Sequence, residues 1–313
     1  MAGGSGRVVV DVHADDYALS MHNARRFVAL MEAGALDSIS VIPNMSCFSE
    51  AMEYLSAKWD GFPRKPLISV HLNIADGRSL ADLKDPLLTR EEGSGAYFFR
   101  TSWGRLLLCS YIPGVRGRLR RELKKELALQ IRRVFGALPA GANAGGGAVS
   151  VLRLDSHTHA HMIPVVFDAM MDAVEELGLQ ERLSFVRVSR EPLKPLLGTA
   201  GRVPAVNYIK NQLLNRLSAR AERRLRRDGV SCGYLWGVLT GGRMDRETVR
   251  RVLPGMRDHA QNKGKRLEIL FHPGRVLADE GLPEEFTPGD REAVISPRRD
   301  AEYEAVLSLK TGE

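Results

Sequence analysis

The sequence contains little cysteine. Its 313 residues include three, Cys47, Cys109 and Cys232, which lie far apart and form no CxxC pair. An odd and sparse set argues against a disulfide framework and for reduced thiols in a cytoplasmic compartment. We interpret these cysteines as having no role in the chemistry of the protein.

Long hydrophobic runs are also missing. No segment approaches the roughly 20 apolar residues of a membrane-spanning helix, and the N-terminal MAGGSGRVVV lacks the apolar core of a secretory signal. We therefore expect no membrane partner. Hydrophobic residues make up 44% of the chain and charged residues 27%, which is a globular composition. The length allows one large α/β domain or two ordinary ones.

The chain lacks a phosphate-binding GxxxxGK[ST] motif, but it carries a net charge of +7 at pH 7. The positive charge is concentrated in residues 116–135 and 211–229, which have the apolar spacing of amphipathic helices. Such an excess suits nucleic acid or a lipid surface. No base-stacking aromatic residues are interleaved with these charges. We favour two solvated outer faces of core-facing helices and expect no nucleic-acid partner.

Apolar runs alternate with helical patterns along the chain. Seven runs are typical of strands: 7–14, 38–44, 67–74, 149–157, 185–190, 231–237 and 267–274. Alternating strands and helices predict a parallel sheet, and mostly apolar strands indicate that both faces are covered. A β/α barrel and an open doubly wound sheet both satisfy this pattern. Seven strands predict that a TIM-like barrel would be distorted or incomplete.

Two segments interrupt the alternation. Residues 75–114 form a long stretch rich in turn residues, and residues 141–147 form the glycine-rich GANAGGG. No internal repeat is evident. We predict a single domain over residues 1–313, with an inserted loop segment at 75–114 and a flexible loop at 141–147.

Unusual polar residues collect where the predicted strands end. They are Asp15 and Asp16 after the first strand, His71 in the third, Asp155, His157, His159 and His161 in DSHTHAH, and His272 in the last. Active sites of β/α barrels and of open α/β sheets lie at the carboxyl ends of the strands. Because alternate residues of an extended chain share a side, the four residues of DSHTHAH are expected to face one cavity.

Carboxylates and imidazoles without thiolates suit zinc or another divalent cation. A cation would neutralise Asp15 and Asp16, which are otherwise costly to bury. One of the two could bind the metal while the other acts as a general base. Taken singly, each residue has an ordinary explanation, such as a solvated turn or a hydrogen-bonded core histidine. Their joint occurrence at four strand ends favours a metal-dependent hydrolase.

Together, these motifs resemble the YdjC-like carbohydrate deacetylases, whose best-known members are chito-oligosaccharide deacetylases. HADDYALS, SVHLN, RLDSHTHAHMIP and LEILFHPG stand in the order of the family's motifs, and RVSREP, LTGGRM and SPRRDAEYEAV are weaker matches. The likeness runs from residue 8 to about residue 307. One departure is Tyr17-Ala18, where the family usually has Phe-Gly. If this backbone needs a positive φ, Ala18 would be strained.

The resemblance implies a distorted β/α barrel, one divalent metal ion (Mg²⁺ or Zn²⁺) and a homodimer. Asp16, His71 and His157 would be the metal ligands, and Asp15 the catalytic base. The implied reaction removes the N-acetyl group from an oligosaccharide that contains N-acetylglucosamine.

Other roles follow from position. His272 is the candidate acid for the leaving amine, with His159 or His161 as competitor. Arg187 and Arg190 have opposite strand parity, so one of them enters the cavity, and we favour Arg187. Arg298 and Arg299 are expected to cap a helix or to pair with surface acids.

Trp103, within an aromatic stretch of the 75–114 segment, is a candidate sugar-stacking residue; a hydrophobic cluster that fixes the loop explains it equally well. Three other functions remain open: hydrolysis of a different small amide, carbohydrate binding without catalysis, and anion binding by a basic protein.

Overall fold

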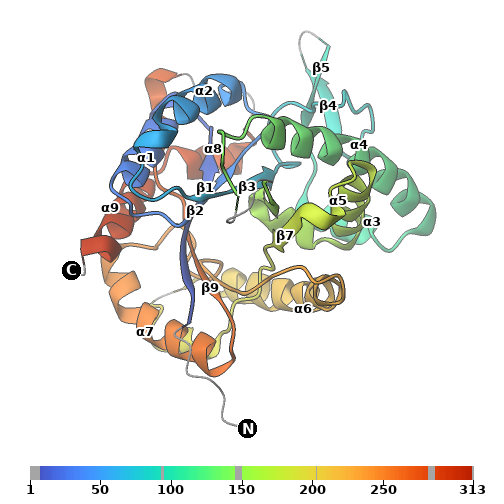
Figure 1. Cartoon of the computed structure of the whole chain (residues 1–313). Helices are drawn as coiled ribbons and strands as arrows, with labels where there is room; N and C mark the ends of the chain where they lie inside the picture. Colours follow the sequence, from blue (N-terminus) through green and yellow to red (C-terminus); the bar gives the residue numbers. More distant parts are fainter. Residues whose placement is uncertain (1–7, 93–94, 145–149, 202, 281–285, 312–313) are drawn as a thin grey trace.

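The computed structural model describes residues 8–311, except 93–94, 145–149, 202 and 281–285. Seven parallel strands form its central sheet, in the order β7-β6-β3-β2-β1-β9-β8, and helices surround it (Figure 1). The strands are β1 (Val10–Tyr17), β2 (Ser38–Val41), β3 (Leu67–Leu72), β6 (Leu152–Ser156), β7 (Leu183–Val186), β8 (Tyr234–Trp236) and β9 (Leu267–Phe271). All seven correspond to strands predicted from the sequence.

Most helices follow a strand, as the alternating pattern predicts. They are α1 (Met21–Glu32), α2 (Phe48–Lys58), α3 (Trp103–Cys109), α4 (Pro113–Gly136), α5 (Pro164–Glu176), α6 (Ala205–Arg227), α7 (Arg246–Asn262), α8 (Pro288–Val294) and α9 (Arg298–Thr311). Short 3₁₀ helices are η1 (Trp59–Gly61), η2 (His157–Met162), η3 (Gln180–Arg182), η4 (Lys194–Leu196) and η5 (Ala278–Glu280). Among the described residues, no helix has the length and apolar character to cross a membrane.

The sheet curls into an incomplete TIM-like barrel. Its edge strands, β7 and β8, approach each other through an isolated bridge between Phe185 and Ser231 instead of a continuous ladder. The Leu235 N–H also donates to the Arg190 carbonyl at 3.0 Å. The predicted fold class is therefore confirmed.

The interior of the barrel is charged, although its strands are mostly apolar. The buried polar side chains inside it include Asp11, His13, Ser38, Ser40, Arg153, Asp155, Arg187 and Glu268. The ring of His13 contacts the hydroxyls of Ser38 and Ser40 at 2.6 and 2.7 Å. Since buried polar groups are costly unless they are paired, this network fixes the strands that carry the site above it.

The segment 75–114 is more regular than the inserted loop that we expected. It contains the antiparallel hairpin of β4 (Thr89–Glu92) and β5 (Ala96–Phe99), followed by α3. The buried Phe99 side chain attaches the hairpin to the core. The polar TREE sequence of β4 has no apolar alternation, so the pattern did not indicate a strand. Of the glycine-rich loop at 141–147, residues 145–147 lie outside the described residues.

The basic helices are α4 and α6, and the outer face of α4 is only partly solvated. Arg120 makes a bidentate contact with Asp172 on α5 at 2.5 and 2.6 Å. Arg116 likewise contacts Asp168 on α5 at 2.5 Å. Part of the basic excess therefore joins α4 to α5, which corrects the expectation of a simple solvated face.

Candidate metal and active site

Adjacent acids at the end of β1 both reach the same cavity because the strand is irregular there. The register of β1 against β2 shifts between Ala14 and Tyr17, and Asp16 and Ala18 have φ values of 77° and 76°. In a regular strand, Asp15 and Asp16 would point to opposite faces. Ala18 stands where the family usually has glycine. Its positive φ is the strained conformation that we considered for this position.

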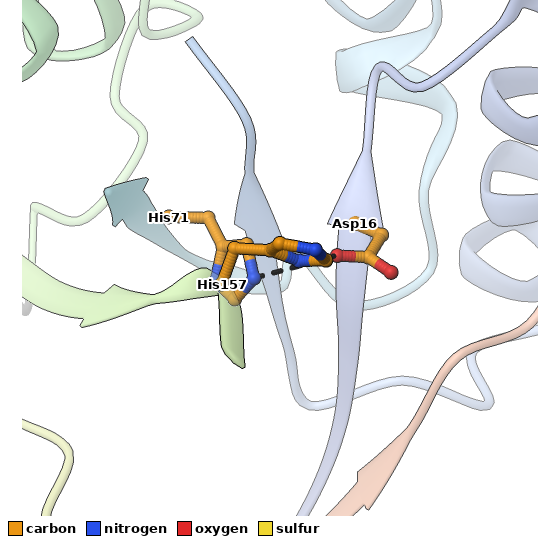
Figure 2. A group of neighbouring side chains, drawn as sticks. All are labelled: Asp16, His71 and His157. Carbon is orange, nitrogen blue, oxygen red and sulfur yellow. Dashed lines mark hydrogen bonds and ion pairs between the residues drawn. The ribbon is translucent and has the colours of Figure 1, made fainter. Parts of the chain in front are cut away.

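Asp16, His71 and His157 converge at the carboxyl ends of β1, β3 and β6. Figure 2 shows both imidazoles beside the Asp16 carboxylate. Asp16 Oδ1 lies 3.4 Å from His71 Nε2 and 3.1 Å from His157 Nδ1. One ligand atom from each residue lies within 4.8 Å of the others. The structure thus brings together the three residues that the resemblance implied as ligands.

Each of these side chains has a further charged neighbour. His71 Nδ1 lies 2.6 Å from Asp155 Oδ1, His157 Nε2 lies 3.7 Å from Asp76 Oδ2, and Arg299 donates to Asp16 Oδ2 at 2.6 Å. Metal-binding histidines commonly present their second nitrogen to a carboxylate, which fixes the ring.

The geometry fits a divalent metal. Two ligand atoms about 2.1 Å from one ion and roughly 90–110° apart are roughly 3.0–3.4 Å from each other, which matches the separations from Asp16 Oδ1 to both imidazoles. His157 Nε2 and Asp76 Oδ2 are buried atoms without hydrogen-bond partners. A nitrogen–nitrogen–oxygen donor set suits zinc and admits other divalent ions.

The carboxylates control the charge of the histidines. Burial lowers the pKa of His71, but the carboxylates of Asp15 and Asp155 outweigh it and raise that pKa to about 10. Burial likewise opposes the charged form of His157, yet the Asp16 carboxylate raises its pKa. The protein without metal therefore keeps His71 protonated beside the place where a cation would bind.

Asp15 is paired with an arginine from inside the barrel. Arg187 donates to both of its carboxylate oxygens, at 2.7 and 2.9 Å, and also to Glu268 at 2.6 Å. Burial would raise the pKa of Asp15, but Arg187 and His71 hold it well below its usual range. Arg187 lies buried in the barrel interior beneath the cavity, whereas the partly exposed Arg190 pairs with Glu222, and Asp15 is kept ionised.

A cavity of about 370 Å³ opens above these residues. His159 and His272 line it, together with Lys210 from α6. The backbone N–H of His272 donates to Glu302 at 2.6 Å, and its ring Nδ1 lies 3.7 Å from the same carboxylate. Of the candidate acids, His272 and His159 therefore face the cavity.

The HTHAH segment is a 3₁₀ turn, η2, so the expectation of an extended chain is wrong. Thr158 and His159 have φ values of 52° and 59°. His161 is buried, and its ring contacts the Ser156 hydroxyl at 2.5 Å and the Arg187 carbonyl at 2.8 Å. Alternate residues therefore do not share one side. Trp103, on α3, lines a neighbouring groove with Thr158 and Lys210.

Several residues at the site were not predicted. Asp76 lies in the loop after β3, and Lys210 lies on α6 just before residues 211–229, which were predicted as a core-facing helix with a solvated outer face. Arg299 was expected to cap a helix or to pair with surface acids; its Nε does donate to the Ala293 carbonyl in the last turn of α8, but the acid that it pairs with is the buried Asp16. No local pattern marks these residues, although the SPRRD sequence, matched weakly to the family, includes Arg299.

Part of the cavity wall is formed by the turn after β8. Gly237 there has a φ of 136°, and a Cβ atom would lie 2.8 Å from the Leu270 Cβ. Glu191 accepts hydrogen bonds from the backbone N–H groups of Gly237, Val238 and Leu239 at 2.8–3.0 Å. A glycine and a buried carboxylate therefore fix this wall.

The fold and the site define an α/β barrel protein with a buried aspartate–histidine cluster at the carboxyl ends of its strands. A model of the YdjC-like protein family matches residues 9–313. The chain therefore belongs to the YdjC-like family, which is related to carbohydrate deacetylases.

The fold is shared with a solved structure. A proposed cellobiose-phosphate cleavage protein from Enterococcus faecalis V583 is similar over 98% of this chain and 93% of its own, with 15% identity and a TM-score of 0.56. A Thermomonospora fusca β-mannanase, crystallised with mannotriose, covers 95% of this chain and 94% of its own at 10% identity and a TM-score of 0.35. A search of curated proteins found no match.

Proposed function

We propose that this protein is a metal-dependent deacetylase that removes the N-acetyl group from an oligosaccharide containing N-acetylglucosamine. The observation that carries the proposal is the convergence of Asp16, His71 and His157 beside an ionised Asp15 on the wall of one cavity. Family membership supports a carbohydrate substrate.

Asp16, His71 and His157 would hold one divalent ion, Zn²⁺ or Mg²⁺. When bound, such an ion polarises a carbonyl oxygen and makes a neighbouring water more acidic. Asp155 orients His71, Asp76 places a carboxylate 3.7 Å from His157 Nε2, and Arg299 occupies the second oxygen of Asp16.

Asp15 is the proposed base. Its Oδ2 lies 3.8 Å from His71 Nε2, so it faces the metal ligands while its other contacts hold it in place. It takes a proton from water as the oxygen adds to the acetamide carbon. Arg187 keeps Asp15 unprotonated before this step, but it also makes the carboxylate a weaker base.

An acid then protonates the amine as the carbon–nitrogen bond breaks, which gives acetate and a free amino sugar. We assign this role to His272, which is 28% exposed beside the cavity. His159 is the competing candidate. Burial and the positive charge of Lys210 hold the pKa of His159 well below the ordinary value. The His159 ring is therefore neutral at neutral pH and is a poor proton donor.

The proposal is tested by measuring acetate release from N-acetylated chito-oligosaccharides. The protein is assayed as purified, after chelation, and after Zn²⁺ or Mg²⁺ is restored. Release that stops with the chelator and returns with the metal supports it, and Asp15→Asn should then abolish turnover while metal binding persists.

Metal binding without acetate release would contradict the proposal. A panel of other small amides would then test the alternative hydrolase, and sugar binding without turnover would identify a carbohydrate-binding protein.

A further inference from the structure

A second groove, of about 320 Å³, adjoins the candidate active site. The two cavities share Thr158 of η2 and Lys210 of α6 as lining residues. The groove therefore continues directly from the place where the reacting N-acetyl group would lie.

The walls of this groove are apolar and open to solvent. Val206 and Ile209 on α6 are 65% and 69% exposed, Trp103 on α3 is partly buried, and Leu214 is a buried lining residue. Neighbouring large apolar side chains on a surface commonly mark a binding site, because they gain free energy when they are covered.

The groove is poorly suited to a second sugar ring. Sugar hydroxyls need hydrogen-bond partners when they leave water. Among the lining residues, the polar side-chain groups are the Thr158 hydroxyl and the Lys210 ammonium, both at the boundary with the active-site cavity, and the indole N–H of Trp103. Aliphatic side chains provide the other walls.

We propose that this groove binds an apolar group attached to the sugar, so that the substrate is an N-acetylglucosaminide with a lipid-like or aryl aglycone. This inference rests on the proposed deacetylase function, whose site it extends. The continuity of the cavities places the aglycone beside Trp103 and Ile209 while the N-acetyl group lies near Asp15 and His157.

The test compares the methyl and octyl β-glycosides of N-acetylglucosamine below the micellar concentration, with the zinc-loaded protein. Burial of a methylene group is worth about fourfold in affinity, so two buried methylenes give roughly tenfold or more in kcat/KM for the octyl glycoside. Ile209→Ser should reduce the octyl-to-methyl ratio by roughly fivefold. The matched control is Leu197→Ser, which changes an apolar residue that is 58% exposed and lies outside the groove; it should leave the ratio unchanged.

A second readout does not depend on turnover. Trp59 and Trp236 are buried, so Trp103 should report octyl glycoside binding by tryptophan fluorescence in the metal-free protein. If no glycoside is deacetylated but Ile209-dependent octyl binding remains, the proposed function fails and the groove assignment stands.

Three results would overturn the inference. Equal kcat/KM for both glycosides, with no fluorescence change, would show that the groove is not used. If kcat/KM for chitobiose exceeded that for the methyl glycoside as much as the octyl glycoside does, and Ile209→Ser reduced both gains equally, the groove would be assigned to a sugar. Conversion of a dimer to a monomer by Ile209→Ser, with no octyl preference, would assign it to a second copy of the chain.

Discussion

Replacing Arg187 with glutamine should strongly destabilise the protein, because this side chain neutralises the centre of the barrel. Its guanidinium contacts Asp15 at 2.7 Å, Glu268 at 2.6 Å and Asp155 at 3.2 Å, and it is 1% exposed. Removing one partner of a buried ion pair costs about 3–5 kcal/mol of unfolding free energy. Glutamine retains hydrogen-bonding groups but not the charge, so we expect a loss in that range.

The loss should depend on pH. In the wild type, the pKa of Asp15 lies well below the ordinary value, so its contribution to stability is present above that ordinary value and disappears as pH falls. In Arg187→Gln, the buried carboxylates of Asp15, Asp155 and Glu268 lose the cation that they contact. Their pKa values in the folded state therefore lie above their pKa values in the unfolded state. The free energy of unfolding of the variant is therefore reduced at pH values above the unfolded-state pKa values. The free-energy gap between wild type and variant should narrow as pH falls from 7 towards about 4.

Urea unfolding followed by circular dichroism measures this gap. Arg226→Gln is the control, since that arginine is 70% exposed in an i,i+4 pair with Glu222 and should cost about 0.5 kcal/mol or less. Adding Glu268→Gln to Arg187→Gln should recover about 1 kcal/mol or more, because one unpaired carboxylate is removed. A loss below about 1 kcal/mol for Arg187→Gln, or a gap that does not change with pH, would refute the reasoning.

Three further predictions concern the site and the wall of its cavity. Because the pKa of His71 is about 10 without metal, Zn²⁺ binding at pH 7 should release about one proton from this residue and tighten about tenfold per pH unit; calorimetry in buffers of different ionisation enthalpy measures the release, and none would contradict it. Asp76→Asn should weaken zinc binding by about 10–100-fold, since it no longer orients His157; an unchanged Kd would remove Asp76 from this role. Glu191→Gln should lower the free energy of unfolding by about 2 kcal/mol in urea titrations, because charge-assisted bonds to the turn after β8 are lost; stability equal to wild type would show that this carboxylate does not fix the turn.

The sequence was sufficient to predict the fold class and the convergence of the candidate site residues. Parallel strands all end at one edge, so residues distant in the sequence, such as Asp16, His71 and His157, are brought together by topology alone. Strand boundaries were less predictable. β1 continues to Tyr17, past the acids expected to follow it, because Arg187 and Arg299 satisfy Asp15 and Asp16 inside the fold.

What could not be predicted depends on three-dimensional contacts. The irregularity at Asp16 and the turn at Thr158 and His159 are positive-φ conformations of non-glycine residues, which tertiary structure imposes against local preference. Lys210 reaches the cavity from a helix whose sequence indicated a solvated face. Amphipathic spacing identifies the buried face of a helix but not the cavity that its other side borders.

The two adjacent acids pointed to this candidate site through their charge, and the structure shows that the charge alone is an incomplete reason. A buried pair of carboxylates needs neutralisation, and a metal was the expected answer. The structure shows that the chain itself supplies it: Arg187 pairs with Asp15, and Arg299 pairs with one oxygen of Asp16. The acids alone therefore do not require a cation. What favours a metal is the second oxygen of Asp16, which faces two imidazoles at ligand-like separations while Arg299 holds the first. This division also distinguishes the acids chemically. Asp15 has both oxygens bound to a fixed arginine, whereas Asp16 keeps one oxygen directed at the histidines, as a metal ligand requires.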